Sequence, residues 1–202
     1  MSNPAGLILD FAGVLTSNMV QTYDLWELRE FHAQGTYLRA WADPRGAELY
    51  RKLELGEISQ AEWNQGFGEL MRVDPTDLMG RLLLDLEPAR EVLRLAGQAR
   101  AAGVRTAVLS NSLGRSPYDP YAPYELDEAF DVVVMSDVCR IRKPDPAIFQ
   151  LALDKLGVEA DSCLFADDTE ENLVPAATMG MSVFHAYDER QTVMWLRRSL
   201  AL

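Results

Sequence analysis

The sequence is poor in basic residues relative to acidic ones. Its 202 residues include 19 lysines and arginines against 31 aspartates and glutamates, which gives a formal net charge of −12. Proteins that bind nucleic acid or an anionic membrane surface do so through clustered Lys and Arg, so we expect neither partner. An anionic small molecule is compatible with this charge, because a metal ion or a few local cations can dominate the potential inside a cleft.

Cysteine and long apolar runs are also scarce. Cys139 and Cys163 lack the close spacing of a metal site, and the second lies in an apolar run, so we expect two buried free thiols and a reducing, cytoplasmic setting. No run approaches the roughly 20 apolar residues that span a bilayer. The N-terminus also lacks a basic segment followed by an apolar one, so we expect a soluble chain without a targeting leader.

Apolar strand-like runs alternate with helical patterns through most of the chain. The strand-like runs cover residues 7–9, 104–111, 130–136, 162–166 and 181–185. The helical patterns cover residues 88–102, 144–157, 170–180 and 188–200. Strands separated by helices of these lengths predict βαβ units, and hence an α/β fold with a mostly parallel, Rossmann-like sheet covered on both faces.

Residues 17–87 interrupt this alternation with large apolar side chains at helical spacing, which we expect to pack in a core rather than to contact substrate. Gly56 ends one predicted helix, and Ser59 caps the next with Glu62 completing a capping box. Asp74-Pro75 is predicted to start a further helix. The sequence therefore predicts an α/β core over residues 1–16 and 88–202, with a small all-helical domain over residues 17–87 inserted into it.

Reactive polar groups follow three of the predicted strands. Asp10 follows the first, Ser110 and Asn111 end the second, and the pair Asp167-Asp168 ends a later one. Because the carboxyl ends of parallel strands meet at one edge of a sheet, we expect these groups to converge. Lys143 precedes a helix that Pro144 could open, so its ammonium is expected to point into the same cleft.

This combination fits a divalent metal and a phosphoryl group. Mg²⁺ takes hard oxygen ligands and would hold together carboxylates that otherwise repel one another. An ionised carboxylate beside it can attack phosphorus to form an aspartyl-phosphate, which water then hydrolyses. Ser110 would bind the transferring oxygens, and Lys143 would neutralise their charge.

The same residues resemble, in order, the four motifs of the haloacid dehalogenase (HAD) superfamily. The resemblance covers the core from end to end and is to the subgroup with a helical cap after the first motif, similar to the phosphatase domain of soluble epoxide hydrolase. The matching segments are Asp10-Phe11-Ala12-Gly13-Val14-Leu15, Ser110-Asn111-Ser112, Lys143-Pro144-Asp145-Pro146, and Phe165-Ala166-Asp167-Asp168 with Asn172.

The resemblance implies a role for each matching residue in a Mg²⁺-dependent hydrolase of small phosphorylated molecules. Asp10 would be the nucleophile and a metal ligand. The backbone carbonyl of Ala12 and the carboxylate of Asp168 would be further ligands, with Asp167 acting directly or through water. Ser110 and Asn111 would contact phosphate, and Lys143 would pair with phosphate and with Asp10.

Ala12 departs from the pattern of HAD phosphatases, which carry a second Asp at this position as general acid and base. Losing that help typically reduces the rate by about 10²–10⁴-fold, most for poor leaving groups. The expected function is therefore a phosphatase with weakened or substituted acid–base catalysis. The alternative is a slow or inactive HAD-fold protein that binds a phosphorylated ligand or a protein partner.

Two further alternatives are hydrolysis of a C–P or a C–halogen bond. Phosphonoacetaldehyde hydrolase also has Ala at this position and uses a cap lysine, for which Lys52 is the candidate here. L-2-haloacid dehalogenases also lack the second Asp, but they need no metal, and the Asp167-Asp168 pair argues against that reading.

The sequence alone does not assign roles to the two histidines or to the tyrosine-rich loop. His32 is a candidate for the missing acid but is more typical of a packing histidine, and His185 is interpreted as structural. The loop over residues 114–124, with Tyr118, Tyr121 and Tyr124, could border the site or a partner surface. The oligomeric state is not determined, a homodimer included.

Overall fold

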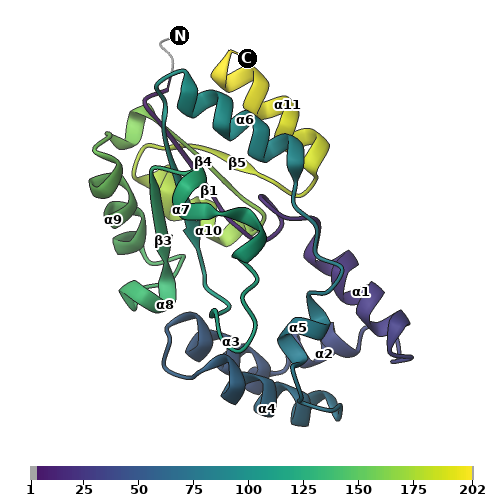
Figure 1. The fold of residues 1–202 in the computed structure, drawn as a ribbon. Coiled ribbons are helices and arrows are strands. Elements are labelled where there is room, and N and C mark those ends of the chain that lie inside the picture. Colours follow the sequence, from purple (N-terminus) through teal and green to yellow (C-terminus); the bar gives the residue numbers. More distant parts are fainter. Residues whose placement is uncertain (1–3, 202) are drawn as a thin grey trace.

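Five parallel strands form one sheet in the computed structural model, which describes residues 4–201 (Figure 1). The strands are β1 (Gly6–Leu9), β2 (Arg105–Ser110), β3 (Val132–Met135), β4 (Cys163–Asp167) and β5 (Ser182–His185). Their order in the sheet is β3-β2-β1-β4-β5, so the first strand lies at the centre. The predicted α/β fold with a mostly parallel sheet is confirmed.

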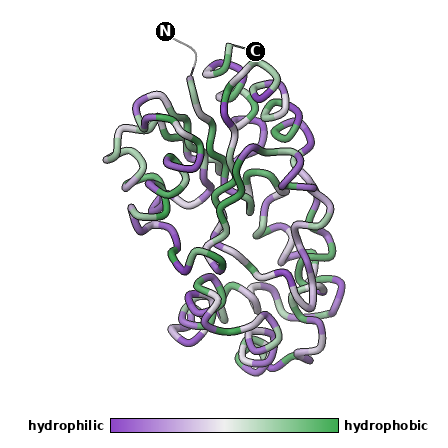
Figure 2. The backbone as a smooth tube through the Cα atoms, turned by 60° about the vertical axis from the view of Figure 1, so that its left-hand side comes forward, coloured by the Kyte–Doolittle hydropathy of each residue, from purple (hydrophilic) through white to green (hydrophobic). Residues whose placement is uncertain are grey.

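Helices cover both faces of the sheet. They are α6 (Arg90–Ala101) and α11 (Glu189–Leu200) on one face, and α9 (Pro146–Leu156) and α10 (Glu170–Thr178) on the other. Leu7 and Leu9 of β1 pack into the apolar cluster under α6 and α11, whereas Ile8 packs into the cluster under α9 and α10. All three are fully buried, as expected for a central parallel strand, and Figure 2 shows these strands as the apolar centre of the core.

Five helices lie between β1 and α6, and we call residues 17–87 the helical segment. The helices are α1 (Met19–Arg29), α2 (Thr36–Ala42), α3 (Pro44–Glu54), α4 (Gln60–Met71) and α5 (Leu78–Leu82). They share an apolar core of their own in which Trp26, Trp63 and Phe67 are fully buried. The expectation that the large aromatic side chains pack in a core is confirmed for these three, while Trp41 is about half exposed.

The two connections between the core and the helical segment run side by side. Thr16 and Pro88 form an isolated antiparallel bridge, and the amide of Ser17 donates to the carbonyl of Glu87 at 2.7 Å. The chain therefore enters and leaves the helical segment at one place, directly after the loop that follows β1.

The structure corrects two predicted helix starts. The helix expected from Pro144 is α9, which begins at Pro146 because Asp145 accepts a hydrogen bond from the third residue of the turn, the Ala147 amide, and caps it. The helix expected from residues 74–75 is α5, which begins only at Leu78. The capping box of Ser59 and Glu62 forms as predicted.

Short elements beside β3 and β4 escaped the sequence patterns, because each is too brief to show a period. They are η1 (Ala122–Tyr124), α7 (Leu126–Ala129), α8 (Ser136–Cys139) and η2 (Ala160–Ser162). The predicted strand over residues 130–136 is correspondingly shorter, since Ser136 already belongs to α8.

Both cysteines are free, as predicted, although only Cys163 is fully buried and Cys139 is half-buried. Among residues 4–201, no helix has the length and apolar character needed to cross a bilayer.

Gly46 of α3 provides a test of how tightly the helical segment is packed. A methyl group at this position would lie 1.9 Å from the carbonyl oxygen of Ala40 in α2. We expect Gly46→Ala to lower the free energy of unfolding by about 1–3 kcal/mol, because the two helices must move apart. Urea denaturation measures the difference.

Gly97→Ala is the matched control. Gly97 is exposed on α6, and a methyl group added there would meet no atom within 4 Å, so helix propensity alone should raise stability by up to about 1 kcal/mol. Equal effects of the two substitutions would contradict the close α2–α3 contact.

Candidate functional site

Three carboxylates meet at the carboxyl edge of the sheet. β1 and β4 are neighbours with Leu9 opposite Ala166, so the residues that follow, Asp10 and Asp167, lie side by side. One oxygen from each of Asp10, Asp167 and Asp168 lies within 4.8 Å of the others. The topology thus brings together residues that are far apart in sequence.

Lys143 bridges two of these carboxylates from the loop after α8. Its Nζ lies 2.7 Å from Oδ1 of Asp10 and 2.6 Å from Oδ2 of Asp167, and it also donates to the carbonyl oxygen of Leu109 at 2.9 Å. The side chain is 1% exposed, so this ammonium is removed from bulk water and depends on these partners.

The charges of the cluster are only partly balanced. Burial raises the pKa of Asp10 well above its usual range, Lys143 opposes this, and the neighbouring Asp167 and Asp168 raise it further. Burial, and then Asp167, also raise the pKa of Asp168. Burial acts to lower the pKa of Lys143, but Asp10 and Asp167 outweigh it and raise that pKa.

Three carboxylates beside one ammonium suit a divalent cation. A hard cation such as Mg²⁺ takes oxygen ligands and would offset the burial and mutual repulsion that raise the pKa values of Asp10 and Asp168. The donor set therefore fits Mg²⁺.

The loop after β1 passes directly against Asp168. A side chain at Gly13 would begin 2.3 Å from Oδ2 of Asp168, and Gly13 has a φ of +71°, so both space and backbone conformation require glycine. The Gly13 amide donates to Oγ1 of Thr16 at 2.8 Å, which fixes the turn. Ala12, half-buried, lies within this loop between Asp10 and Gly13.

Asn111 holds Lys143 in place. Its Oδ1 accepts from the Lys143 amide at 2.9 Å, and its Nδ2 donates to the Lys143 carbonyl at 3.2 Å. Both ends of the amide are therefore engaged, which favours a positioning role over the predicted phosphate contact. Ser110 lies buried at the end of β2, where its hydroxyl donates weakly to the Asn111 carbonyl at 3.3 Å.

The two aspartates of the pair differ in their surroundings. Oδ2 of Asp167 accepts from Lys143, and Oδ1 accepts from the side chain of Asn172 and the amide of Thr169, each at 2.9 Å. Asp168 is only partly buried and has a side-chain contact with Oγ1 of Thr169 at 3.1 Å. The carboxylate of Asp168 is thus the less engaged of the two, whereas both oxygens of Asp167 accept hydrogen bonds from protein groups.

Sequence patterns did not identify two residues of the helical segment, Glu54 and Tyr23, that interact with residues at this edge. Glu54, at the end of α3, has Oε2 2.6 Å from Nε of Arg142, next to Lys143 in the chain. Burial raises the pKa of Tyr23 on α1 to about 12, its phenol neighbours Tyr37 and Tyr50 oppose this, and the charge of Asp168 raises it further. No short motif marks such residues, because only the packing of the segment brings them here.

His32 and Lys52 contact residues of the helical segment, whereas His185 contacts the backbone of Asp168. His32 lies against Trp26, with Nε2 3.5 Å from Glu30, within the helical segment. Lys52 is partly exposed and lies 3.8 Å from Glu48, which does not support a Schiff-base role. His185 ends β5, and its Nε2 lies 2.9 Å from the backbone carbonyl of Asp168, so it touches the site's backbone.

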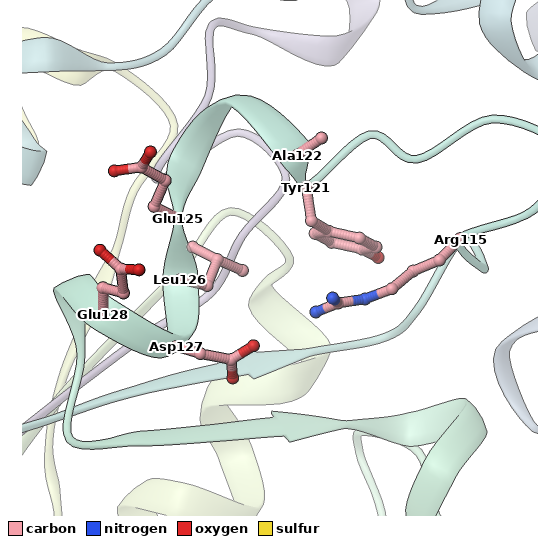
Figure 3. Close-up of a pocket in the computed structure, with 7 residues that line it drawn as sticks. All are labelled: Arg115, Tyr121, Ala122, Glu125, Leu126, Asp127 and Glu128. Atoms are coloured by element: carbon pink, nitrogen blue, oxygen red, sulfur yellow. The ribbon is translucent and has the colours of Figure 1, made fainter.

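The tyrosine-rich loop packs beneath the loop after β1. The rings of Tyr121 and Tyr124 lie 4.5 Å and 4.8 Å from the ring of Phe11, and both are buried. A pocket of about 220 Å³ lies beside Tyr121, and Arg115 points toward the Tyr121 ring at this pocket (Figure 3). None of the three clustered carboxylates lines this pocket, so it is separate from the site.

Comparison with known proteins agrees with this geometry. Residues 4–180 match the haloacid dehalogenase-like hydrolase family. The chain is 30% identical over 183 residues to mouse acyl-CoA dehydrogenase family member 10, covering 87% of this chain but 17% of that protein. It is 32% identical over 139 residues to phosphatase MT3486 of Mycobacterium tuberculosis, covering 68% of this chain and 58% of that one.

A dehalogenase is similar as well. The chain is 31% identical over 121 residues to (S)-2-haloacid dehalogenase 1 of a Pseudomonas species, covering 58% of this chain and 52% of that enzyme. The chain thus spans from about a sixth to somewhat over half of the lengths of these three relatives.

Solved structures share the fold. A HAD family enzyme of Bacteroides thetaiotaomicron, as an aspartate-to-alanine variant in complex with magnesium and inorganic phosphate, has a TM-score of 0.66 at 21% identity, covering 90% of this chain and 93% of that one. The L-2-haloacid dehalogenase of Xanthobacter autotrophicus has a TM-score of 0.65 at 20% identity, covering 89% and 76%. On the family match over residues 4–180, this chain belongs to the haloacid dehalogenase-like hydrolases.

Proposed function

We propose that this hydrolase is a Mg²⁺-dependent phosphatase that acts on a small phosphorylated molecule through an aspartyl-phosphate on Asp10. The observation that carries the proposal is the Lys143 ammonium, held between Asp10 and Asp167 with Asp168 alongside. The phosphatase of M. tuberculosis among the relatives, and the magnesium and phosphate complex of the Bacteroides enzyme, support the same chemistry.

Asp10 and Lys143 would perform the central step. An oxygen of Asp10 forms a bond to phosphorus as the bond to the leaving oxygen breaks, and Lys143 offsets the negative charge of the transferring oxygens. Water then attacks phosphorus, which releases inorganic phosphate and restores the Asp10 carboxylate. Asp10, Asp168, the carbonyl of Ala12 and, through water, Asp167 would hold Mg²⁺, which when bound supplies charge neutralisation and polarises the phosphoryl oxygens.

Ala12 leaves this step without an acid–base side chain next to the nucleophile. The leaving oxygen would take its proton from water or from a group of the helical segment, so good leaving groups should react faster than alkoxides. The same residue favours a second function, in which the protein binds a phosphorylated ligand with little turnover.

The helical segment, residues 17–87, would serve as the cap of the site. It joins the core through the paired connections at Thr16 and Pro88, next to the loop of Asp10, and its Glu54 pairs with Arg142, the neighbour of Lys143 in the chain. The closer similarity to the phosphatase domain of soluble epoxide hydrolase stays a prediction, as does the division into core and cap domains.

Asp10→Asn tests the nucleophile. With an activated aryl phosphate and Mg²⁺, we expect the rate to fall by at least about 10³-fold, because the amide cannot form the covalent intermediate. Asp154→Asn, an exposed position on α9, is the matched control and should keep full activity. Activity that survives Asp10→Asn would refute the covalent mechanism.

Ala12→Asp tests the missing acid. We expect the rate with an alkyl phosphate to rise by about 10²–10⁴-fold, and the rate with an activated aryl phosphate to rise much less, because the latter needs no proton. Steady-state kinetics with both substrates measures this. If Ala12→Asp raised the rates with the alkyl and the aryl phosphate equally, protonation of the leaving group would not be the step that Ala12 limits.

Mg²⁺ should stabilise the protein through Asp168. At a concentration of 100 times its Kd, one bound ion adds about 2.7 kcal/mol to the free energy of unfolding, and the resulting rise in Tm should be lost in Asp168→Asn. Differential scanning fluorimetry with Mg²⁺ and with EDTA measures the shift. The Asp154→Asn control should keep it, and an unchanged shift in Asp168→Asn would place the ion elsewhere.

A further inference from the structure

The cations of the helical segment are already engaged or lie away from the site. Carboxylates lie within 4 Å of five of them, which are Arg29, Arg45, Arg51, Lys52 and Arg81. Arg39 donates to the carbonyl of Gln34, and Arg72 is exposed at the end of α4, the helix of the segment drawn farthest from the sheet in Figure 1. The described segment therefore offers the site no unpaired buried cation.

The loops that follow the strands hold four more cations, and these too are engaged or point elsewhere. Lys143 is bound by Asp10 and Asp167. Arg142 pairs with Glu54. The two others are Arg140, which donates to the carbonyls of Leu55 and Gly56, and Arg115, which lies over the Tyr121 ring in the pocket of Figure 3.

Three tyrosines form a cluster of neutral hydroxyls within the helical segment. The ring of Tyr23 stacks on Tyr37 with centroids 3.6 Å apart, and the hydroxyls of Tyr37 and Tyr50 are hydrogen-bonded to each other. Tyr23 is the outermost of the three, since it is half-buried while the other two are buried. Burial holds all three pKa values above the usual phenol value, so these groups stay uncharged.

From these contacts we infer that the site selects phosphate esters with an uncharged leaving group and rejects esters whose leaving group carries a second anion. The inference rests on the proposed phosphatase function and names its substrate class. The phosphoryl group would meet Lys143 and the metal, whereas the leaving group would meet the helical segment, whose Glu54 already engages Arg142 beside Lys143. A carboxylate or second phosphate there would lose its water and meet no unpaired cation of the helical segment or of the strand loops.

The proposal separates this protein from two relatives of known substrate type. Phosphoglycolate phosphatase of Rhodospirillum rubrum is 34% identical over 91 residues, and the Pseudomonas dehalogenase is 31% identical over 121 residues. Phosphoglycolate and 2-haloacids both carry a carboxylate next to the reacting group. By the same charge argument, neither compound is a good substrate here.

Binding of two stable phosphonates tests the inference without turnover. Acetonylphosphonate and phosphonoacetate have nearly the same shape, but only the second carries a carboxylate. By titration calorimetry with Mg²⁺, we expect acetonylphosphonate to bind at least about tenfold more tightly, because an unpaired anion in a buried site is disfavoured. Equal affinities, or tighter binding of phosphonoacetate, would overturn the proposal.

Glu54→Gln tests the engaged arginine. The substitution frees Arg142 beside the site, so the preference for uncharged leaving groups should shrink, measured as the ratio of kcat/KM for glycerol phosphate to that for phosphoglycolate. Glu48→Gln makes the same change on the exposed side of α3, where it pairs with Arg51, and should leave the ratio unchanged. An unchanged ratio in Glu54→Gln, or the same change in both variants, would count against the role of Arg142.

The two proposals fail in different ways. If no ester is hydrolysed and Asp10→Asn changes nothing, the phosphatase function is wrong, while the phosphonate affinities still decide the charge preference. If esters are hydrolysed but phosphoglycolate is the better substrate, the phosphatase function stands and the charge preference is wrong. Should Glu54→Gln fail to fold, the wild-type phosphonate affinities decide.

Discussion

The site depends on one buried ammonium group. Lys143 reaches the ends of three strands at once, through Asp10 after β1, Leu109 in β2 and Asp167 in β4. Removing one partner of such a buried ion pair typically destabilises a protein by about 3–5 kcal/mol, because the other charge is left unpaired. The backbone of Lys143 is in turn held on both sides by Asn111. The same contacts that close the sheet edge therefore set the position of the Asp10 carboxylate.

The helical segment is fastened to this edge by polar contacts and by Leu113, which packs into the apolar cluster of the segment. The side chain of Gln60 donates to the carbonyls of Leu113 and Tyr118 and accepts from the Tyr118 amide. Ser136 donates to the carbonyl of Glu54, near the Glu54–Arg142 pair. Since these contacts are specific in direction, they fix the orientation of the helical segment against the loops that follow β2 and β3.

Ala12 is the residue at which this chain departs from the first motif of the HAD phosphatases. The loop around it turns at Gly13 and lies against Asp168. The methyl side chain of Ala12 cannot carry a proton. Both phosphatases and dehalogenases occur among the relatives, so family membership does not decide between P–O and C–halogen cleavage. The paired aspartates and the charge they share with Lys143 favour the phosphoryl reaction.

The sequence by itself determined the alternation of strands and helices, the parallel sheet and the convergence of Asp10, Lys143 and the Asp167-Asp168 pair. Those features follow from local periodicity and from the rule that parallel strands end at one edge. The tertiary structure alone decided that Asn111 binds the backbone of Lys143, that α9 begins at Pro146, and that Glu54 engages Arg142. Partner choice among polar side chains depends on distances of a few tenths of an ångström between distant segments, and no local pattern encodes such distances.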